Sequence, residues 1–432
     1  MARRPRPVTT VLDNGLAVVA QPMPWLDSAS VRIAFRAGSR YETRETSGIA
    51  HFIEHLVFQG GERYRTPMEV RGAVEGVGGD VNALTGRETV EYVFTLPARY
   101  LHSGFDVLSD MIRSARLDHR VIEMEREAIL QEFADDDDDL LNRADLALRG
   151  LLFTDSPLSW DVGGTRENIR RFVRDDFVRF RRANYVASDA ALVVAGDVSS
   201  SKVFRDAERF FGFLPETSLA RPAIAPCVLL GGSDPVATVA LPRQQVFILM
   251  GTVAPEGNSA QEAACAVLAA ALGDGTASRL YRELRFRRGL VYQTDADYTA
   301  DVDYGLFSLS ALTDPKNAVE TVSVMAATCR SFTRHLLSDK ERLRAKRLIA
   351  GGRMRNCESA EHVSDYLMVD QLAYGAPTTF RQYIHEYDHT TSEEVRAVAR
   401  DLLRHGRLKL ALAGAVTPEM VERIRETIPE FR

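Results

Sequence analysis

Cysteine is scarce in this sequence, and its scarcity excludes a secreted fold held together by disulfides. Only four cysteines occur in 432 residues, and no two of them share the close spacing of a zinc-binding or redox pair. Isolated thiols of this kind are typical of proteins in a reducing compartment. We therefore expect a cytoplasmic protein with four unpaired thiols, at Cys227, Cys265, Cys329 and Cys357.

Long apolar runs are also missing. No stretch of about 18 consecutive apolar residues occurs, which a membrane-spanning helix would need. The first residues, Met-Ala-Arg-Arg-Pro-Arg-Pro, are basic but lack the apolar region of a secretion signal. The sequence therefore predicts neither a membrane span nor a secretion signal.

Charge of one sign is not in large excess. The formal net charge of −6 is too small to indicate a nucleic-acid partner. With 45% hydrophobic and 26% charged residues, the chain has the balance of a globular protein. A chain of 432 residues exceeds a single ordinary core, so we expect at least two domains.

The most informative stretch runs from Gly48 to Gly61 and reads G-I-A-H-F-I-E-H-L-V-F-Q-G-G. His51 and His55 are four residues apart, which places them on one face of a helix, and Glu54 shares that face. Two neutral imidazoles aimed at one point can bind zinc. A carboxylate beside them can accept a proton from a water molecule on the metal. We also expect Ser47 to cap this helix.

The alternative interpretation is a helix with two ordinary histidines. The order His-x-x-Glu-His is more demanding than a histidine pair and is a catalytic pattern. A catalytic zinc needs a third protein ligand and an open fourth position. The helix expected from Asp118 to Leu141 is the best source, because Glu125 and Glu132 are seven residues apart and return to nearly the same face. Spacing leaves open which one is the ligand, and such a helix is often only a charged surface.

The two halves of the chain look like a repeat. Residues 192–196 (L-V-V-A-G) and 410–414 (L-A-L-A-G) match at an offset of 218 (410 minus 192). At that offset His51 falls on Ala269 and His55 on Gly273, so the second half lacks the metal residues. We expect a catalytic zinc-binding domain over residues 1–213, a linker rich in Pro and Gly over 214–235, and a non-metal domain over 236–432.

Five motifs stand out along the first third of the chain. They are H-F-I-E-H (51–55), F-Q-G (58–60), G-G-D-V-N-A (78–83), T-G-R-E (85–88) and E-R-E-A-I-L-Q-E (125–132). Together they resemble the pitrilysin family of zinc metallopeptidases, in the branch of the mitochondrial processing peptidase and its bacterial relatives. The resemblance covers essentially the whole chain, including the two-repeat layout. It implies an α+β fold with two homologous domains, each an antiparallel-rich sheet with helices mainly on one face, that form half of a clamshell chamber.

The resemblance also implies a ligand set. In that family the glutamate ligand lies 77 residues after the second histidine, and Glu132 lies 77 residues after His55 (132 minus 55). The implied cofactor is therefore one zinc ion per chain, held by His51, His55 and Glu132. Glu125 is implied as the supporting carboxylate, and Glu54 as the general base.

Further residues are implied to bind the substrate and to stabilise the reaction. Active members carry an Arg and a Tyr seven residues apart, and Arg285 and Tyr292 match this pair in the stretch R-F-R-R-G-L-V-Y. A cation and a phenol can stabilise an oxyanion, although such spacing alone is compatible with ordinary packing. A peptide is expected to add as a strand to an edge strand of the first half. The matching residues are Asn82, Ala83, Leu84 and Thr85.

The sequence thus favours a zinc-dependent endopeptidase that hydrolyses peptides or unfolded segments inside a dimer chamber. The chain carries both the zinc set and the Arg/Tyr pair, so we expect a homodimer, with a heterodimer of homologous subunits as the alternative. Neither nucleic acid nor a membrane is expected as a partner. Two other hypotheses remain: a non-catalytic or partner-dependent subunit of a processing peptidase, and a peptide-binding protein that acts without turnover.

Overall fold

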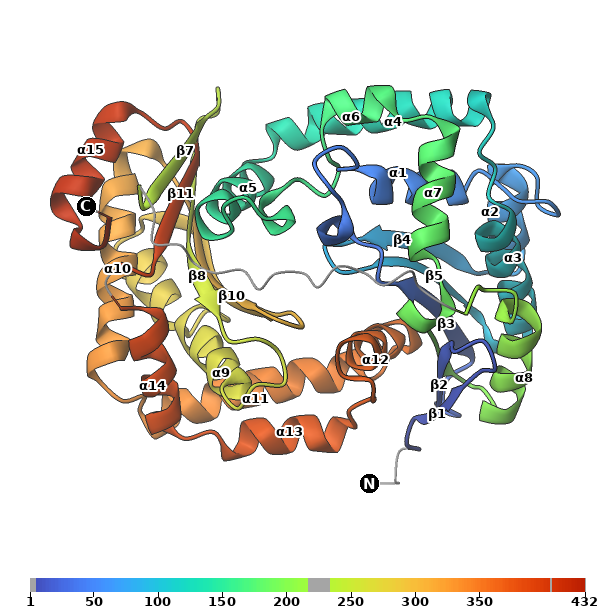
Figure 1. Ribbon diagram of the computed structural model, residues 1–432. Helices are drawn as coiled ribbons and strands as arrows, with labels where there is room; N and C mark the ends of the chain where they lie inside the picture. Colours follow the sequence, from blue (N-terminus) through green and yellow to red (C-terminus); the bar gives the residue numbers. More distant parts are fainter. Residues whose placement is uncertain (1–4, 217–233, 405, 432) are drawn as a thin grey trace. The chain divides into compact units, whose positions relative to one another are not determined.

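The computed structural model describes residues 5–216, 234–404 and 406–431. Their contacts divide the chain into two compact units, each with its own sheet and its own core (Figure 1). Unit 1 is built from Met1–Phe133, Trp160–Ile224 and Met354–Thr379, and unit 2 from Ala134–Ser159, Ala225–Arg353 and Phe380–Arg432.

Unit 1 contains a mixed six-stranded sheet in the order β1-β2-β6-β3-β5-β4. Only β2 and β6 pair in parallel, and the other neighbours are antiparallel. The strands are β1 (Val8–Val11), β2 (Ala17–Pro22), β3 (Ser28–Phe35), β4 (Asp80–Thr85), β5 (Val90–Pro97) and β6 (Ala190–Gly196). The helices are α1 (Ile49–Val57), α2 (Pro67–Glu75), α3 (Leu101–Ser114), α4 (His119–Asp138, ending in unit 2), α6 (Arg166–Arg171), α7 (Arg174–Asn184), α8 (Ser200–Phe211) and α12 (Ala360–Tyr374).

Unit 2 contains a five-stranded sheet in the order β7-β11-β8-β10-β9, in which only β7 and β11 pair in parallel. The strands are β7 (Val236–Ala240), β8 (Val246–Ala254), β9 (Val291–Ala300), β10 (Gly305–Thr313) and β11 (Lys409–Gly414). The helices are α5 (Leu140–Leu152), α9 (Glu262–Leu272), the π-helical turn η5 (Tyr281–Phe286), α10 (Ala318–Arg334), α11 (Asp339–Asn356, ending in unit 1), α13 (Phe380–His389), α14 (Ser392–Leu402) and α15 (Pro418–Thr427).

The predicted α+β class, with two homologous halves, is confirmed. Adding the offset of 218 to the bounds of α7 gives 392–402, which are the bounds of α14. The same offset carries the first residue of β3, Ser28, onto the first residue of β8, Val246. Corresponding strands therefore occupy corresponding places in the two sheets.

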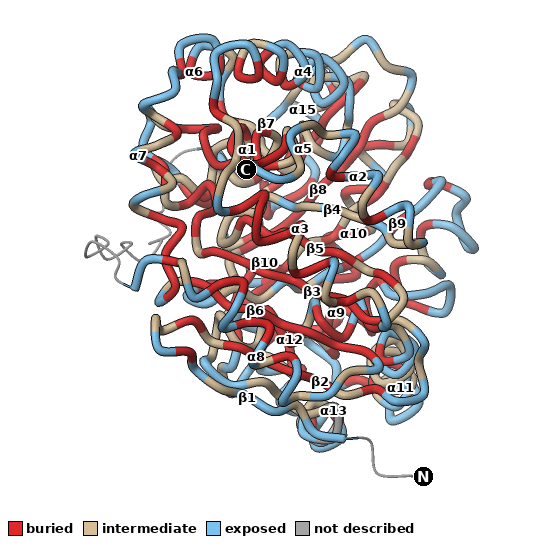
Figure 2. Tube along the Cα trace, turned by 90° about the vertical axis from the view of Figure 1, so that its right-hand side faces the viewer, coloured by how far each residue is buried: buried red, intermediate tan, exposed pale blue. Residues whose placement is uncertain are grey.

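The core of unit 1 lies on one face of its sheet. Alternate residues of β3 point to opposite faces, and Val31 and Ile33 are fully buried in the core beneath α1, α2, α3 and α8. Strands β3 and β6 are buried along nearly their whole length (Figure 2). The site helix α1 is thus fixed to the sheet by its apolar side.

The other face of each sheet is covered by a helix from the other half of the sequence. Helix α12 packs on β2, β3 and β6, where Ser364 lies 3.0 Å from Ser30 (oxygen to oxygen). Helix α5 packs on β7, β8 and β11, where Leu148 and Phe247 share a small apolar cluster. At the 218 offset α5 and α12 are counterparts, so the two halves exchange one helix.

Because of this exchange, the two compact units do not coincide with the predicted domains. Among the described residues, every strand of unit 1 precedes residues 214–235 and every strand of unit 2 follows them. Residues 134–159, however, pack in unit 2, and residues 354–379 pack in unit 1. Residues 217–233 of the predicted linker, together with Cys227, lie outside the described residues.

Two further expectations can be compared with the structure. The other three cysteines, Cys265, Cys329 and Cys357, are buried, and Cys265 and Cys329 are free thiols. Among the described residues, no helix is long and apolar enough to cross a membrane.

Candidate metal centre

Helix α1 places two imidazoles on its polar side. Its apolar residues Phe52, Ile53 and Leu56 are buried in the core of unit 1. His51 and His55 therefore project from the opposite side, half-buried, with their ring centroids 4.8 Å apart. The expected pairing of the two histidines on one helix face is thus present in the structure.

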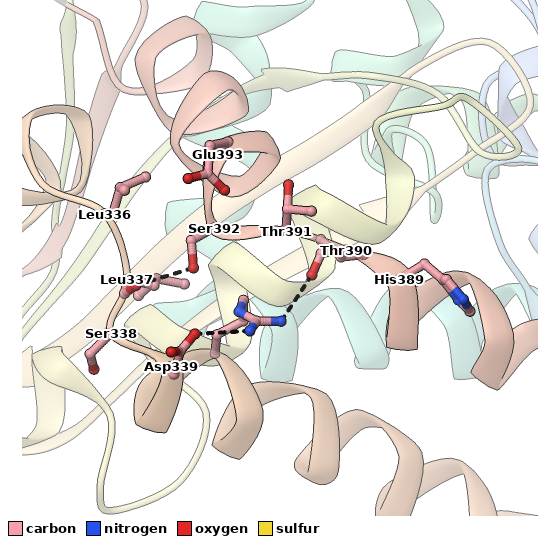
Figure 3. Close-up of a pocket in the computed structure, with 10 residues that line it drawn as sticks. Leu336, Leu337, Ser338, Asp339, His389, Thr390, Thr391, Ser392 and Glu393 are labelled. Carbon is pink, nitrogen blue, oxygen red and sulfur yellow. Dashed lines mark hydrogen bonds and ion pairs between the residues drawn. The ribbon is translucent and has the colours of Figure 1, made fainter.

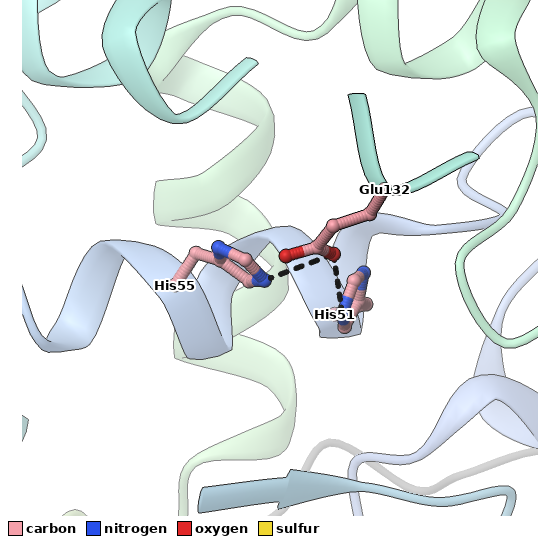
Figure 4. Close-up of side chains that lie close together, drawn as sticks. All are labelled: His51, His55 and Glu132. Carbon is pink, nitrogen blue, oxygen red and sulfur yellow. Dashed lines mark ion pairs between the residues drawn. The ribbon is translucent and has the colours of Figure 1, made fainter. Parts of the chain in front are cut away.

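Glu132 approaches both imidazoles from α4. Its Oε2 lies 3.8 Å from Nε2 of His51 and 3.6 Å from Nε2 of His55. Figure 4 shows the three side chains pointing toward one another. Their ligand atoms all lie within 4.8 Å, and no other group of three such side chains occurs in the described part of the chain.

The donor set fits a zinc ion. Ligand atoms about 2.0–2.2 Å from a tetrahedral zinc lie roughly 3.3–3.5 Å from one another. The separations of 3.6 and 3.8 Å between Oε2 of Glu132 and the two Nε2 atoms are close to that geometry. Two imidazole nitrogens and one carboxylate are also a ligand set that zinc enzymes use, with the fourth position left open. The Glu132 side chain is 48% exposed, so the cluster is accessible from solvent on that side.

Glu125, two helical turns before Glu132, lies behind His55. Its Oε2 is 3.0 Å from Nδ1 of His55, and the residue is buried. A proton on Nδ1 leaves the Nε2 lone pair of His55 free to face Glu132, which is the orientation a metal ligand needs. Among the described residues, the buried Nδ1 of His51 has no comparable partner.

The surrounding charges act differently on the two histidines. Burial, followed by the charge of His55, lowers the pKa of His51 to about 4, so this imidazole is neutral at physiological pH. Burial also opposes charge on His55. The hydrogen bond to Glu125 and the charges of Glu132 and Glu54 outweigh that effect and raise the pKa of His55.

Glu54 lies one residue before His55 and is held by β4. Its Oε2 accepts a hydrogen bond of 2.8 Å from the Thr85 hydroxyl. Burial raises the pKa of Glu54, and the hydrogen bond from Thr85 opposes that shift. A carboxylate with a raised pKa is a better proton acceptor than an exposed one. The sequence predicted Thr85 as part of the substrate strand and gave no signal for its contact with Glu54.

Strand β4 is an edge of its sheet, as predicted, since β5 is its only partner among the described strands. The N–H of Ala83 donates to Oδ1 of Asn82 at 2.9 Å, so a side chain satisfies this backbone donor. Asn82 is exposed, and Leu84 is 59% exposed. The strand thus presents polar backbone and side-chain groups beside Glu54.

Arg285 and Tyr292 lie in unit 2, whereas the histidines lie in unit 1. Nη1 of Arg285 donates to the Val291 carbonyl at 2.6 Å, and the Tyr292 hydroxyl donates to Oδ1 of Asp314 at 3.0 Å. The hydrogen bond to Asp314 raises the pKa of Tyr292, and the charge of Arg285 opposes that shift. The structure therefore brings the Arg and the Tyr together within unit 2.

The place that corresponds to the histidines in the second half is closed. A Cβ on Gly273, the counterpart of His55, would lie 1.9 Å from the backbone nitrogen of Ala296 in β9. Only glycine fits so close to another backbone. No imidazole could occupy this position, which agrees with the expectation of a non-metal second half.

A separate cavity of about 450 Å³ lies in unit 2 (Figure 3). Arg342 on its wall donates to Oδ1 of Asp339 at 2.9 Å and to the Thr390 carbonyl at 3.4 Å. None of the predicted site residues lines it. The cavity is therefore distinct from the metal-ligand cluster.

Two family profiles match successive parts of the chain. "Insulinase (Peptidase family M16)" matches residues 17–162, and "Peptidase M16 inactive domain" matches residues 171–349. A protein of Mycobacterium tuberculosis named "uncharacterized zinc protease" is 30% identical over 417 residues, which cover 95% of this chain and 94% of the relative. The chain belongs to peptidase family M16. The predicted family is thereby confirmed.

Other M16 proteins resemble this chain in part of its sequence or in fold. The β subunit of the mitochondrial-processing peptidase of Neurospora crassa is 35% identical over 210 residues, which cover 49% of this chain and 44% of the subunit. The crystal structure of a protease from Helicobacter pylori matches with a TM-score of 0.87 at 22% identity, covering 95% of this chain and all of that one. At this identity the structural match shows the fold alone.

Proposed function

We propose that this M16 chain is a zinc-dependent endopeptidase that hydrolyses peptides or unfolded polypeptide segments. The observation that carries the proposal is the meeting of His51, His55 and Glu132, with Glu54 on the same helix. The donor types and their separations suit zinc. The relative named a zinc protease supports the same cofactor.

The side chains around the cluster have different roles in the proposed hydrolysis. Zinc, when bound, supplies Lewis-acid polarisation of a carbonyl and lowers the pKa of water. Glu54 accepts the proton of the attacking water and passes it to the leaving amine. Thr85 orients Glu54 through its 2.8 Å hydrogen bond, and Glu125 orients His55 through its 3.0 Å contact.

The substrate is expected to bind in an extended conformation along β4. An added strand forms backbone hydrogen bonds whatever its sequence, which suits a peptidase that acts on many segments. The substrate-binding residues in this proposal are Asn82, Ala83, Leu84 and Thr85. Arg285 and Tyr292 are proposed to stabilise the oxyanion, as a cation and a phenol donor aimed at developing charge.

We further propose that the enzyme is a cytoplasmic homodimer. The buried free thiols of Cys265 and Cys329 support the compartment, because a reducing environment leaves thiols free. The single chain carries both the metal residues and the Arg/Tyr pair, which supports a self-sufficient homodimer. The alternative is a partner-dependent subunit of a heterodimer, and the relative named as the β subunit of a processing peptidase favours it.

The test is cleavage of a pool of unstructured peptides by the wild type and by Glu54→Gln, with the zinc content of both recorded. We expect Glu54→Gln to keep zinc and to lose about 10²–10⁴-fold in rate, the usual contribution of a general base. Glu75→Gln, an exposed glutamate at the end of α2, serves as the control and should cleave like the wild type.

Three other outcomes of this test would contradict part of the proposal or favour its alternative. Equal cleavage by Glu54→Gln and the wild type would remove Glu54 from its role as base. A wild type that binds no zinc would contradict the proposed cofactor. A zinc-loaded wild type that cleaves only after a homologous second chain is added would establish the partner-dependent alternative.

A further inference from the structure

The start of α1 has no cap of its own. The residue before its first turn is Gly48, whose φ of 95° is left-handed, and no side chain at this position caps the helix. A Cβ on Gly48 would lie 2.4 Å from the Gly163 carbonyl oxygen, so the position tolerates only glycine. The expectation that Ser47 caps the helix is therefore wrong. The first N–H groups of a buried helix must be satisfied from elsewhere.

Glu42 supplies the missing acceptors. Its Oε2 accepts a hydrogen bond from the N–H of Gly48, and its Oε1 accepts one from the N–H of Ala50, both at 2.9 Å. The residue is 5% exposed. Ala50 directly precedes His51, so one carboxylate holds the backbone at the turn that carries this histidine.

The segment that carries Glu42 is itself anchored. It follows the short 3₁₀ helix η1 (Ser39–Tyr41), whose first two N–H groups bond to the turn between β4 and β5. The N–H of Ser39 reaches the Gly86 carbonyl at 3.1 Å, and the N–H of Arg40 reaches the Arg87 carbonyl at 3.0 Å. This turn directly follows Thr85, which holds Glu54. Glu42 therefore connects the start of α1 to the end of β4.

Among the described residues, no basic side chain pairs with Glu42. Burial raises the pKa of Glu42 to about 8, and the N–H groups of the first turn of α1 oppose the shift. The two backbone hydrogen bonds at the start of α1 are therefore the polar contacts that hold the Glu42 side chain.

We propose that Glu42 is a positioning residue that fixes the first turn of α1 and so holds His51 at the right distance from His55 and Glu132. The inference rests on the metal site of the proposed function. His55 has its own support from Glu125, whereas the Nδ1 of His51 has no partner among the described residues. The backbone position set by Glu42 is what keeps His51 in the cluster.

The test compares the wild type with Glu42→Gln, which keeps the size of the side chain but loses one acceptor. Two quantities are measured on the full chain: the dissociation constant of Zn²⁺, by competition with a chelator, and the visible absorption of the Co²⁺-substituted protein. We expect about 10- to 100-fold weaker zinc binding, the usual effect of losing a group that orients a ligand. The Co²⁺ bands should also change in position or intensity.

The matched control is Glu430→Gln, another buried carboxylate, which pairs with Arg330 in unit 2. It should lower the melting temperature but leave the zinc affinity and the Co²⁺ spectrum as in the wild type. If Glu42→Gln does not fold, Glu42→Asp takes its place. This variant keeps both oxygens but shortens their reach, so it should weaken zinc binding in the same way.

Two results would overturn the inference. Equal zinc affinity and an unchanged Co²⁺ spectrum in the folded Glu42 variant would show that Glu42 is only structural. Equal losses in the Glu42 and Glu430 variants would show that general instability is the cause. A wild type without zinc affinity would instead mean that the proposed function itself fails, so the two failures are distinguishable.

Discussion

Glu125 and Glu132 both lie on α4 but have different surroundings, and these surroundings suit different roles. Glu132 is 48% exposed and faces the Nε2 atoms of both histidines, whereas the Glu125 side chain is 10% exposed and faces only Nδ1 of His55. A metal ligand must face the open side of the cluster, and a supporting carboxylate must lie behind a ligand. The geometry therefore supports Glu132 as the ligand, a choice that spacing alone had left open.

A single carboxylate in unit 2 should make stability depend on pH. Glu341 accepts hydrogen bonds from Nε and Nη2 of Arg279, at 2.8 and 3.0 Å, and from the Ser338 hydroxyl at 2.8 Å. The bond from Arg279 is the main reason that the pKa of Glu341 is lowered from 4.5 to about 2. A carboxyl with a lowered pKa stabilises the folded state above its ordinary pKa, and this stability is lost as pH falls toward the folded value.

We expect Glu341→Gln to be less stable than the wild type by about 1–2 kcal/mol at neutral pH, a figure reduced for solvent screening of a partly exposed pair. Below pH 4.5 the deficit should shrink, because the wild-type carboxyl loses its contribution between 4.5 and about 2. Denaturant unfolding of both proteins at neutral pH and at about pH 3.5 measures the difference. A deficit that stays constant across this range would contradict the assignment.

At the scale of elements, the sequence pattern predicts which face of a helix is buried and which segments repeat. It does not predict which sheet a helix packs on. The period of α1 and the spacing of its histidines predicted the metal-ligand face. The 218 offset predicted that α14 is the counterpart of α7 in the repeat. The exchange of α5 and α12 was not predictable. Periodicity shows that a helix has an apolar face, but it does not show which of two similar sheets covers that face.

Contacts between distant segments could not be predicted from the sequence either. The bonds from Glu42 to the start of α1 and from Thr85 to Glu54 depend on loops whose course local pattern does not determine. Helix caps show the contrast. Where the cap is a neighbouring Thr, Ser or Asp, the start of the helix can be found from the sequence. Such caps are Thr66, Asp139, Thr165, Ser359, Thr391 and Thr417.

The edge strand β4 gives a prediction at this scale. Among the described residues, the N–H of Ala83 bonds to the Asn82 side chain, so an added strand can take this donor over. Ala83→Pro removes this donor, and proline is tolerated on edge strands. We expect kcat/KM for extended peptides to fall about five- to tenfold, the worth of one hydrogen bond of about 1 kcal/mol. Steady-state kinetics on one defined peptide measures the change.

Ala83→Ser is the matched control for the edge-strand prediction. It alters the side chain but keeps the N–H, so its kcat/KM should stay near that of the wild type. Zinc content should be equal in all three proteins, because the strand holds no metal ligand. Equal loss in the Ser and Pro variants would mean that the side chain, and not the backbone donor, contacts the substrate.

At the scale of the whole molecule, the two units carry different parts of the proposed chemistry. Unit 1 holds the metal-ligand cluster and the edge strand, and unit 2 holds Arg285 and Tyr292. In unit 2 the close approach of Gly273 to the backbone of β9 excludes a histidine at the position that corresponds to His55. In the proposed mechanism, the second half contributes to the reaction through Arg285 and Tyr292.

The last prediction concerns assembly. The family resemblance implies a chamber of four such domains, and one chain supplies two, so we expect a mass in solution of about twice the 48.0 kDa of the chain. Light scattering over a range of concentrations measures it, with peptidase activity followed in parallel. Because association depends on concentration, specific activity should fall on dilution as dimers dissociate. A stable monomer with full activity would contradict the homodimer. An inactive monomer that gains activity from a homologous chain would identify a heterodimer.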